Sequence, residues 1–258
     1  MSLWYSISHP KEQLFNQISL ARYTNNSNAF LVCGGPSLNF INPDVLKGPG
    51  RTVLGMNNVY PFVKPDIWLG LDKPDCYNRQ LFWESFIKIM RFDYRFEKTN
   101  NLDIVNLFNM FFIKVQQIQS PLQVFTDRKN YIEFAWQKNT FTVALQLLVW
   151  MGFNKIYIFG CDFDNSKQHY YNNVVLEEQY KNLNTRLYNN LNEYLEWFSV
   201  TAEQYGINVY SCSPDSKINE YLEYKNYKTV ITDIERNIPH GGQLLHSFQV
   251  HDLNKSHS

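Results

Sequence analysis

Short polar segments follow several apolar runs of the chain, and their residue types could bind a nucleotide. Residues 29–33 lead into Gly34-Gly35-Pro36-Ser37, a glycine turn whose backbone amides could approach a phosphate while the Ser37 hydroxyl adds a donor. Other apolar runs end at Asn57, Asp72, Asp162 and the segment 211–214. We therefore expect one nucleotide site lined by Gly34, Gly35, Pro36, Ser37, Asn57, Asp162 and Ser213.

The glycine turn differs from the two best-known phosphate-binding loops. It lacks the lysine of a nucleoside-triphosphate P-loop and the third glycine of the dinucleotide fingerprint. A tight strand-to-helix turn without a ligand is the alternative interpretation.

Acidic residues and one histidine supply candidate catalytic groups. Carboxylates such as Asp72 and Asp162 could hold Mg²⁺ against phosphates. His169 is the single histidine between His9 and His240, and an imidazole can accept a hydroxyl proton near neutral pH. The alternatives are a capping role for Asp162, a turn role for Asp72 and a solvated surface position for His169.

The elements that must position these groups alternate along the chain. Residues 29–33, 52–56, 67–71, 155–159 and 207–210 are short apolar runs typical of strands buried on both faces. Residues 79–91, 140–151 and about 176–205 show helical spacing of apolar positions. This order predicts a single α/β Rossmann-like domain with a mostly parallel sheet and helices on both faces. Ligands bind such sheets beyond the carboxyl ends of the strands.

The predicted domain spans residues 29–238. Residues 1–28 are predicted to be an N-terminal extension and residues 239–258 a polar C-terminal tail. Residues 92–139, rich in Phe, Asn and Gln, fit the alternation poorly and are predicted to be an insertion that covers the site.

Charge and composition exclude several classes of protein. Twenty-four basic residues balance twenty-four acidic ones, so the excess of positive charge typical of nucleic-acid binding is missing. No secretory leader or membrane-length apolar segment is evident, and the four cysteines lack the paired spacing of a zinc site. We expect a cytoplasmic protein with free thiols, and an oligomer is compatible with the sequence.

The motifs together resemble two related families. The turn at 34–38, the strand ending at Asn57, the pre-helical Thr140 and the segment Met151-Gly152-Phe153 to Asp162-Phe163 are similar to those of the bacterial lipooligosaccharide sialyltransferases, which use a CMP-activated sugar. They also resemble the 6-hydroxymethylpterin diphosphokinase-like family. The resemblance covers about residues 29–75 and 139–222, around half of the chain.

The sialyltransferase resemblance implies roles for particular residues. Gly35, Ser37, Asn57 and Thr140 fall where those enzymes hold the nucleotide, and Tyr170 falls on one of two phosphate-binding tyrosines. The second tyrosine position is Asp164 here, and the stretch near residues 188–190 lacks the general-base histidine of that family. The diphosphokinase resemblance instead matches Asp72, Asp162 and His169.

Three functions follow as hypotheses. A glycosyltransferase would move a sugar from a nucleotide-activated donor to a small-molecule or glycan acceptor, with no required cofactor. His169 would be its base, Asp164 the reserve, and Tyr170 would serve the phosphate. A diphosphokinase would need Mg²⁺ at Asp72 and Asp162. A non-catalytic nucleotide or sugar binder is the third, favoured by the missing histidine.

Overall fold

A computed structural model describes seven parts of the chain: residues 3–6, 15–18, 28–117, 122–126, 133–137, 139–163 and 178–238. The predicted C-terminal tail lies outside these residues, as does the segment with Asp164, His169 and Tyr170.

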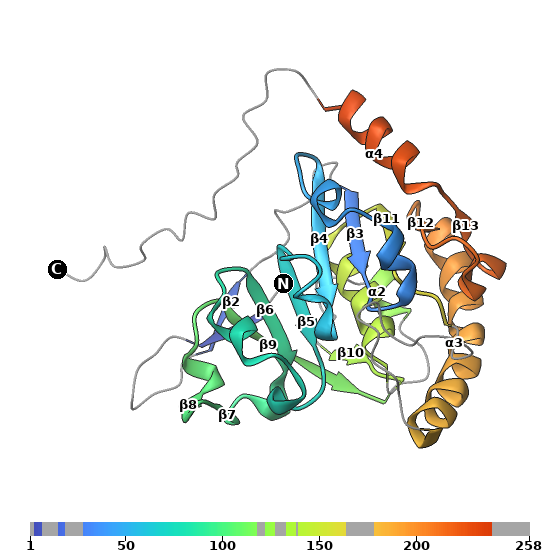
Figure 1. The fold of residues 1–258 in the computed structure, drawn as a ribbon. Helices are drawn as coiled ribbons and strands as arrows, with labels where there is room; N and C mark the ends of the chain where they lie inside the picture. The colour runs from blue at the N-terminus through green and yellow to red at the C-terminus, as the bar shows by residue number, and fades with distance from the viewer. Residues whose placement is uncertain are drawn as a thin grey trace.

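One mostly parallel sheet organises the described residues (Figure 1). Its strand order is β13-β12-β11-β3-β4-β5-β6-β9-β1-β2, with β10 paired to β9. The strands are β1 (Leu3–Ser6), β2 (Phe15–Ile18), β3 (Asn28–Val32), β4 (Arg51–Met56), β5 (Ile67–Gly70), β6 (Ile87–Arg91), β9 (Met110–Gln116), β10 (Glu133–Ala135), β11 (Lys155–Phe159), β12 (Asn208–Ser211) and β13 (Glu223–Tyr224).

The direction of the chain across the sheet reverses between β3 and β11. From β3 it proceeds through β4, β5 and β6 to β9, and it then returns to add β11, β12 and β13 on the other side of β3. All of these neighbours pair in parallel. The predicted fold class is confirmed, and the reversal creates a topological switch point where open α/β sheets bind ligands.

Two predicted boundaries were wrong. Residues 92–139 are not an insertion over the site, because β9 continues the sheet beside β6 and β10 extends it further. Within the predicted N-terminal extension, β1 and β2 pair antiparallel at the far edge of the same sheet. The alternating pattern was obscured there because short turns and a small hairpin, β7 (Lys98–Thr99) with β8 (Leu102–Asp103), separate these strands.

Short 3₁₀ turns, not α-helices, connect β3 to β6 across one face of the sheet. They are η2 (Pro36–Phe40), η3 (Pro43–Leu46), η4 (Asn57–Val59), η5 (Pro74–Cys76) and η6 (Arg79–Trp83). Proline opens three of them, at a first-turn position where the missing amide costs no hydrogen bond. The predicted helix at 79–91 is wrong: this segment is η6 followed by the buried strand β6.

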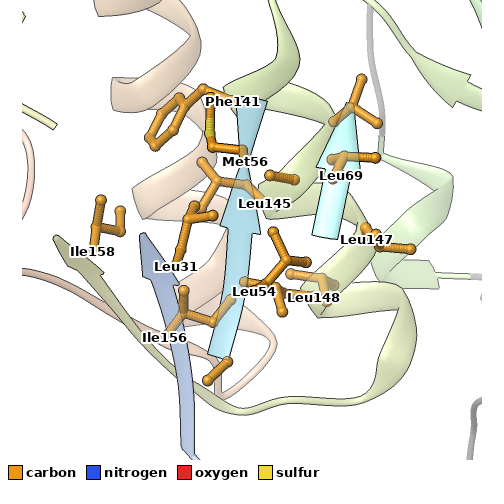
Figure 2. Packing of buried hydrophobic residues seen from close by; sticks show 14 of the residues in the cluster. Leu31, Leu54, Met56, Leu69, Phe141, Leu145, Leu147, Leu148, Ile156 and Ile158 are labelled. Atoms are coloured by element: carbon orange, nitrogen blue, oxygen red, sulfur yellow. The ribbon is translucent and has the colours of Figure 1, made fainter. Parts of the chain in front are cut away.

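Two α-helices cover the opposite face, as predicted. In α2 (Thr140–Met151) every residue is buried, and α3 (Glu178–Gln204) packs alongside (Figure 1). Figure 2 shows Leu145 and Leu148 of α2 among Leu31, Leu54 and other strand residues that form this core. A final helix, α4 (Tyr227–Arg236), packs its apolar residues into the cluster on the 3₁₀ face, and a one-turn helix, α1 (Gln123–Thr126), lies against α2.

Gln146 explains how a polar residue fits inside α2. Its side chain accepts a hydrogen bond from the Ala135 amide at 2.9 Å and donates to the Ala135 carbonyl at 2.8 Å. The Gln146 side-chain amide thus makes the two backbone hydrogen bonds at the end of β10 that a neighbouring strand would otherwise make. No helix in the described part of the chain is long and apolar enough to span a bilayer.

Candidate functional site

The switch point brings together the two turns that the sequence singled out. Because β3 and β11 are neighbours, the glycine turn after β3 lies against Gly160 and Asp162 after β11. The Gly35 amide donates to the Gly160 carbonyl at 2.7 Å, and the Ser37 amide donates to Asp162 Oδ2 at 2.9 Å. The two turns therefore form one hydrogen-bonded unit at the carboxyl edge of the sheet.

Gly35 leaves the room that this contact needs. A Cβ at Gly35 would lie 2.2 Å from Asp162 Oδ2 and 2.6 Å from the Gly160 carbonyl oxygen. Gly160 has a φ of +65°, and its own Cβ would lie 2.6 Å from the Cys33 carbonyl. Both glycines are required for close approach of the chain to itself.

This arrangement corrects the prediction of an open phosphate cradle. The amides of Gly35 and Ser37 are bonded as above, the Leu38 amide donates to the Gly35 carbonyl at 3.2 Å, and Pro36 has no amide. The Asp162 carboxylate occupies the anion position at the start of η2. A phosphate cannot take these donors unless Asp162 moves away.

Buried serines extend the unit to β12. The Ser37 hydroxyl donates to Ser213 Oγ at 3.1 Å, and Ser213 Oγ accepts from the Cys161 amide at 3.2 Å. Ser213 is fully buried and Ser37 nearly so. These hydroxyls, predicted to contact nucleotide, instead join the turns that follow β3, β11 and β12.

A surface hollow of about 530 Å³ adjoins this serine network. The amide nitrogen of Asn219, in the hollow wall, donates to the Ser213 carbonyl at 3.2 Å. Its Oδ1 is buried, and no described residue donates a hydrogen bond to it. In the sequence, the only indication of this hollow was the polar segment 211–214, which ends a predicted strand. The wall consists of Pro214, Asp215, Ser216, Lys217, Asn219, Glu220 and Tyr224.

Asn57 lies on the other side of the glycine turn, where β4 ends. Its backbone has a left-handed φ of +53°, which asparagine tolerates better than most residues, and its carbonyl accepts from Trp68 Nε1 at 2.7 Å. Asn57 Oδ1 is buried and has no hydrogen-bond donor among the described residues. A buried acceptor without a partner costs free energy, so it marks a place where a ligand could donate.

Thr140 reaches the same edge from the helical face. It is the first residue of α2, whose N-cap is Asn139 and whose positive end points to the carboxyl edge. Figure 2 shows Phe141 beside Met56, the residues adjoining Thr140 and Asn57, in one core cluster. The residues next to Asn57 and Thr140 thus belong to one core cluster, and a nucleotide site shared by the two side chains stays a prediction.

Asp72 is exposed after β5 and lies apart from Asp162. Its amide donates to the Tyr77 hydroxyl at 2.8 Å, and burial followed by the Asp72 charge raises the pKa of Tyr77 far above its usual value. β4 and β3 separate β5 from β11, which places the two carboxylates about 14 Å apart at ordinary strand spacing. One Mg²⁺ bonds oxygens at about 2.1 Å and cannot be shared by both. No metal-binding group of three His, Cys, Asp or Glu occurs among the described residues.

Phe163 is a feature that the sequence did not reveal. It has a φ of +52°, which is unusual for a bulky residue, and it is the last residue of the described range 139–163. Its ring stacks on Tyr188 of α3 with centroids 4.8 Å apart and meets Phe141 edge-on at 5.6 Å. These contacts hold α2 and α3 together beside Asp162. The predicted catalytic residues His169, Asp164 and Tyr170 follow in the segment outside the described residues.

Comparison with known proteins gave structural neighbours only. No protein-family profile matches the sequence, and no curated protein is significantly similar. The monofunctional α-2,3-sialyltransferase Cst-I from Campylobacter jejuni is 15% identical, with a TM-score of 0.43 over 78% of this chain and 81% of that chain. The sialyltransferase CstII from the same organism, in complex with CMP-3FNeuAc, is 14% identical, with a TM-score of 0.40 over 77% and 86%. Similarity at these TM-scores carries no conclusion about this chain.

Proposed function

We propose that this protein is a nucleotide-dependent transferase that binds a nucleotide-activated sugar along the carboxyl edge of the sheet. The observation that carries the proposal is the pair of buried acceptors without partners, Asn57 Oδ1 and Asn219 Oδ1. They flank the switch point on opposite sides, after β4 and after β12. Three strand spacings separate these strands, about 14 Å, which is close to the length of a nucleotide.

Each of these two oxygens would accept a hydrogen bond from the ligand. Ribose hydroxyls and the exocyclic amine of a nucleobase are such donors, and pairing them with Asn57 and Asn219 would remove the cost of two unsatisfied oxygens. The Asp162 carboxylate repels a phosphate from the glycine turn. The phosphate would instead lie toward Thr140 and the N-terminus of α2, where the hydroxyl and the helix dipole favour negative charge.

The sugar-transfer step rests on the sequence resemblance to sialyltransferases. A base must accept the proton of the acceptor hydroxyl while the nucleotide phosphate departs, and His169 is the proposed base, with Asp164 in reserve. Tyr170 would stabilise the departing phosphate. The diphosphokinase alternative has less support, because Asp72 and Asp162 lie too far apart to share one magnesium ion.

Thermal shift with single nucleotides tests the proposal directly. CMP, CDP, UDP, GDP and ATP would each be added with and without Mg²⁺, because a ligand of the native state raises Tm by mass action. We expect one nucleotide class to raise Tm without Mg²⁺, and the cognate nucleotide sugar to be hydrolysed slowly in the absence of acceptor. No shift with any nucleotide would overturn the proposal, and binding without turnover would leave a nucleotide-binding protein.

A matched pair of variants then assigns the site. Asn57→Gly removes the unpartnered acceptor and keeps the left-handed backbone, so it should abolish most of the nucleotide-induced shift. Asn101→Gly makes the same exchange at an exposed left-handed asparagine in the β7–β8 turn. Equal nucleotide shifts in both variants would place the nucleotide elsewhere.

A further inference from the structure

A cluster of cations stacked on aromatic rings lies where β6 and β9 end. The Arg91 guanidinium lies 4.4 Å from the Trp136 ring and 5.2 Å from the Tyr94 ring. The Arg95 guanidinium lies 3.9 Å from the Phe92 ring and 4.3 Å from the Phe96 ring. Stacking on rings holds a guanidinium plane in a fixed orientation while its edge stays available for hydrogen bonds.

The two arginines differ in charge compensation. Arg91 forms an ion pair with Asp93. No carboxylate lies within ion-pair distance of Arg95 among the described residues, where its one hydrogen-bond acceptor is the Phe92 carbonyl at 2.9 Å from Nη1. The Nε atoms of both arginines are buried without an acceptor in that same part of the chain. Arg95 therefore carries a positive charge and N–H groups that the described chain does not fully use.

Apolar surface accompanies this charge. Phe96 is 50% exposed beside Arg95, and Lys114 of β9 lies 5.9 Å from the Phe92 ring. Lys114 is 4.0 Å from Glu133, a separation that leaves the pair weakly bound and partly hydrated. An exposed ring next to fixed cations is suited to a ligand with one apolar face and a negative group.

The cluster adjoins the proposed nucleotide edge. Trp136 follows β10 directly, shortly before Asn139 caps α2 at Thr140. β6 is two strand positions from β4, so Arg91 lies about 10 Å along the edge from Asn57. That separation suits an acceptor bound next to a donor nucleotide sugar.

We propose that Arg95, with Arg91, Phe92 and Phe96, binds the acceptor, and that the acceptor is an anionic saccharide carrying a carboxylate or a phosphate. The acidic group pairs with the Arg95 guanidinium, and a face of the sugar ring packs on Phe96. The inference rests on the proposed function for its acceptor role. The binding itself is measurable without a nucleotide.

Titration calorimetry with four probes tests the proposal. D-glucuronate carries a carboxylate, glucose 6-phosphate a phosphate, glucose is the neutral control and inorganic phosphate the control without a sugar. We expect one of the two acidic sugars to bind at least about tenfold more tightly than glucose and inorganic phosphate, as for a charge-assisted hydrogen bond. The preferred acidic sugar identifies the anion. Equal binding of all four probes, or none, overturns the proposal.

Variants separate this site from the nucleotide site. Arg95→Ala should lose the preference for the acidic sugar, and Arg95→Lys should recover part of it by keeping the charge without the planar fork. Arg79→Ala is the matched control, because Arg79 is exposed and bonds the Asn100 side chain at 3.3 Å. All three variants should retain the wild-type nucleotide shift. An Arg95→Ala protein that folds and keeps its acidic-sugar affinity overturns the assignment.

Nucleotide binding and acidic-sugar binding are measured separately. Nucleotide binding without acidic-sugar binding would leave the proposed function standing and remove the acceptor site. Acidic-sugar binding at Arg95 without any nucleotide binding would remove both the proposed function and the acceptor role.

Discussion

The polar groups at the switch point and those farther along the same edge are used in opposite ways. Between β3 and β11, the amides of Gly35 and Ser37 and the carboxylate of Asp162 bond to one another inside the chain. One strand away on either side, the Asn219 and Asn57 amide oxygens have no partner in the described chain, and neither does the Nε atom of Arg95 farther along the edge. Satisfied polar groups stabilise a fold, and unsatisfied ones indicate where a ligand could bind.

The glycine turn and Asn57 therefore differ in role. The glycine turn looks like a phosphate loop in sequence, yet its donors hold the fold together. Asn57 belongs to the same predicted site, and it presents an acceptor that nothing in the described chain satisfies. Substitutions in the first region should therefore affect stability, and substitutions in the second should affect binding.

Gly35→Ala should give the largest effect on folding. The new methyl group would overlap Asp162 Oδ2 and the Gly160 carbonyl oxygen, and the carbonyl belongs to the backbone and cannot easily move away. We therefore expect the free energy of unfolding, measured with urea, to fall by about 3 kcal/mol. Gly206→Ala is the control for adding a methyl group without a clash, because no atom lies within 4 Å of its added Cβ, although Gly206, unlike Gly35, has a left-handed φ of +71°. That change should cost about 1 kcal/mol. Equal losses in both would contradict the close approach at Gly35.

The pH dependence of stability tests the effect of burying Lys88, a charged residue inside the fold. Its side chain is fully buried and donates to the carbonyls of Glu84 and Phe86, and burial lowers its pKa to about 8. The unfolded chain holds this proton up to its ordinary pKa of about 10.4. Above pH 8 the unfolded state thus binds more protons, and stability should rise with pH.

The expected gain from Lys88 is about 2 kcal/mol between pH 7 and pH 9.5, measured as the difference between wild type and Lys88→Met. Below the folded pKa the cost of the buried charge is fully present, and it is relieved as pH rises through 8. Parallel stability profiles for the two proteins would show that Lys88 keeps an ordinary pKa.

Asp162→Ala should destabilise the fold by about 1 to 2 kcal/mol, because the Ser37 amide loses its acceptor. The same substitution removes one of the two atoms that obstruct a Cβ at Gly35. Gly35→Ala and Asp162→Ala combined should therefore cost less than the sum of the single losses. Additive losses would argue against contact between these two residues.

Asn57→Gly should have the smallest effect on stability, within about 0.5 kcal/mol, since glycine accepts the left-handed backbone and no described donor is lost. Urea unfolding of the free protein measures this. A loss of 2 kcal/mol or more would mean that the Asn57 side chain serves the fold, and the contrast with the switch point would fail.

Periodicity and turn residues were sufficient to predict much of the architecture. The apolar runs at 29–33, 52–56, 67–71, 155–159 and 207–210 became β3, β4, β5, β11 and β12, and the helices at 140–151 and 176–205 became α2 and α3. Buried parallel strands need continuous apolar runs, so local composition reports them directly. Prediction failed at 79–91 and 92–139, where tertiary packing made strands from segments of mixed character.

The sequence by itself determined the fold class and the sheet edge to which Gly35, Asn57, Thr140 and Asp162 belong. These follow from local patterns and from the handedness of parallel crossovers. Only the tertiary structure decided what each group does at that edge. Asp162 and Ser37, which are joined by a hydrogen bond, are 125 residues apart in the sequence. No local sequence pattern predicts that a carboxylate will occupy the position expected for a phosphate. Likewise, whether the side chain of an asparagine or arginine has a hydrogen-bond partner depends on all the residues that the fold places around it.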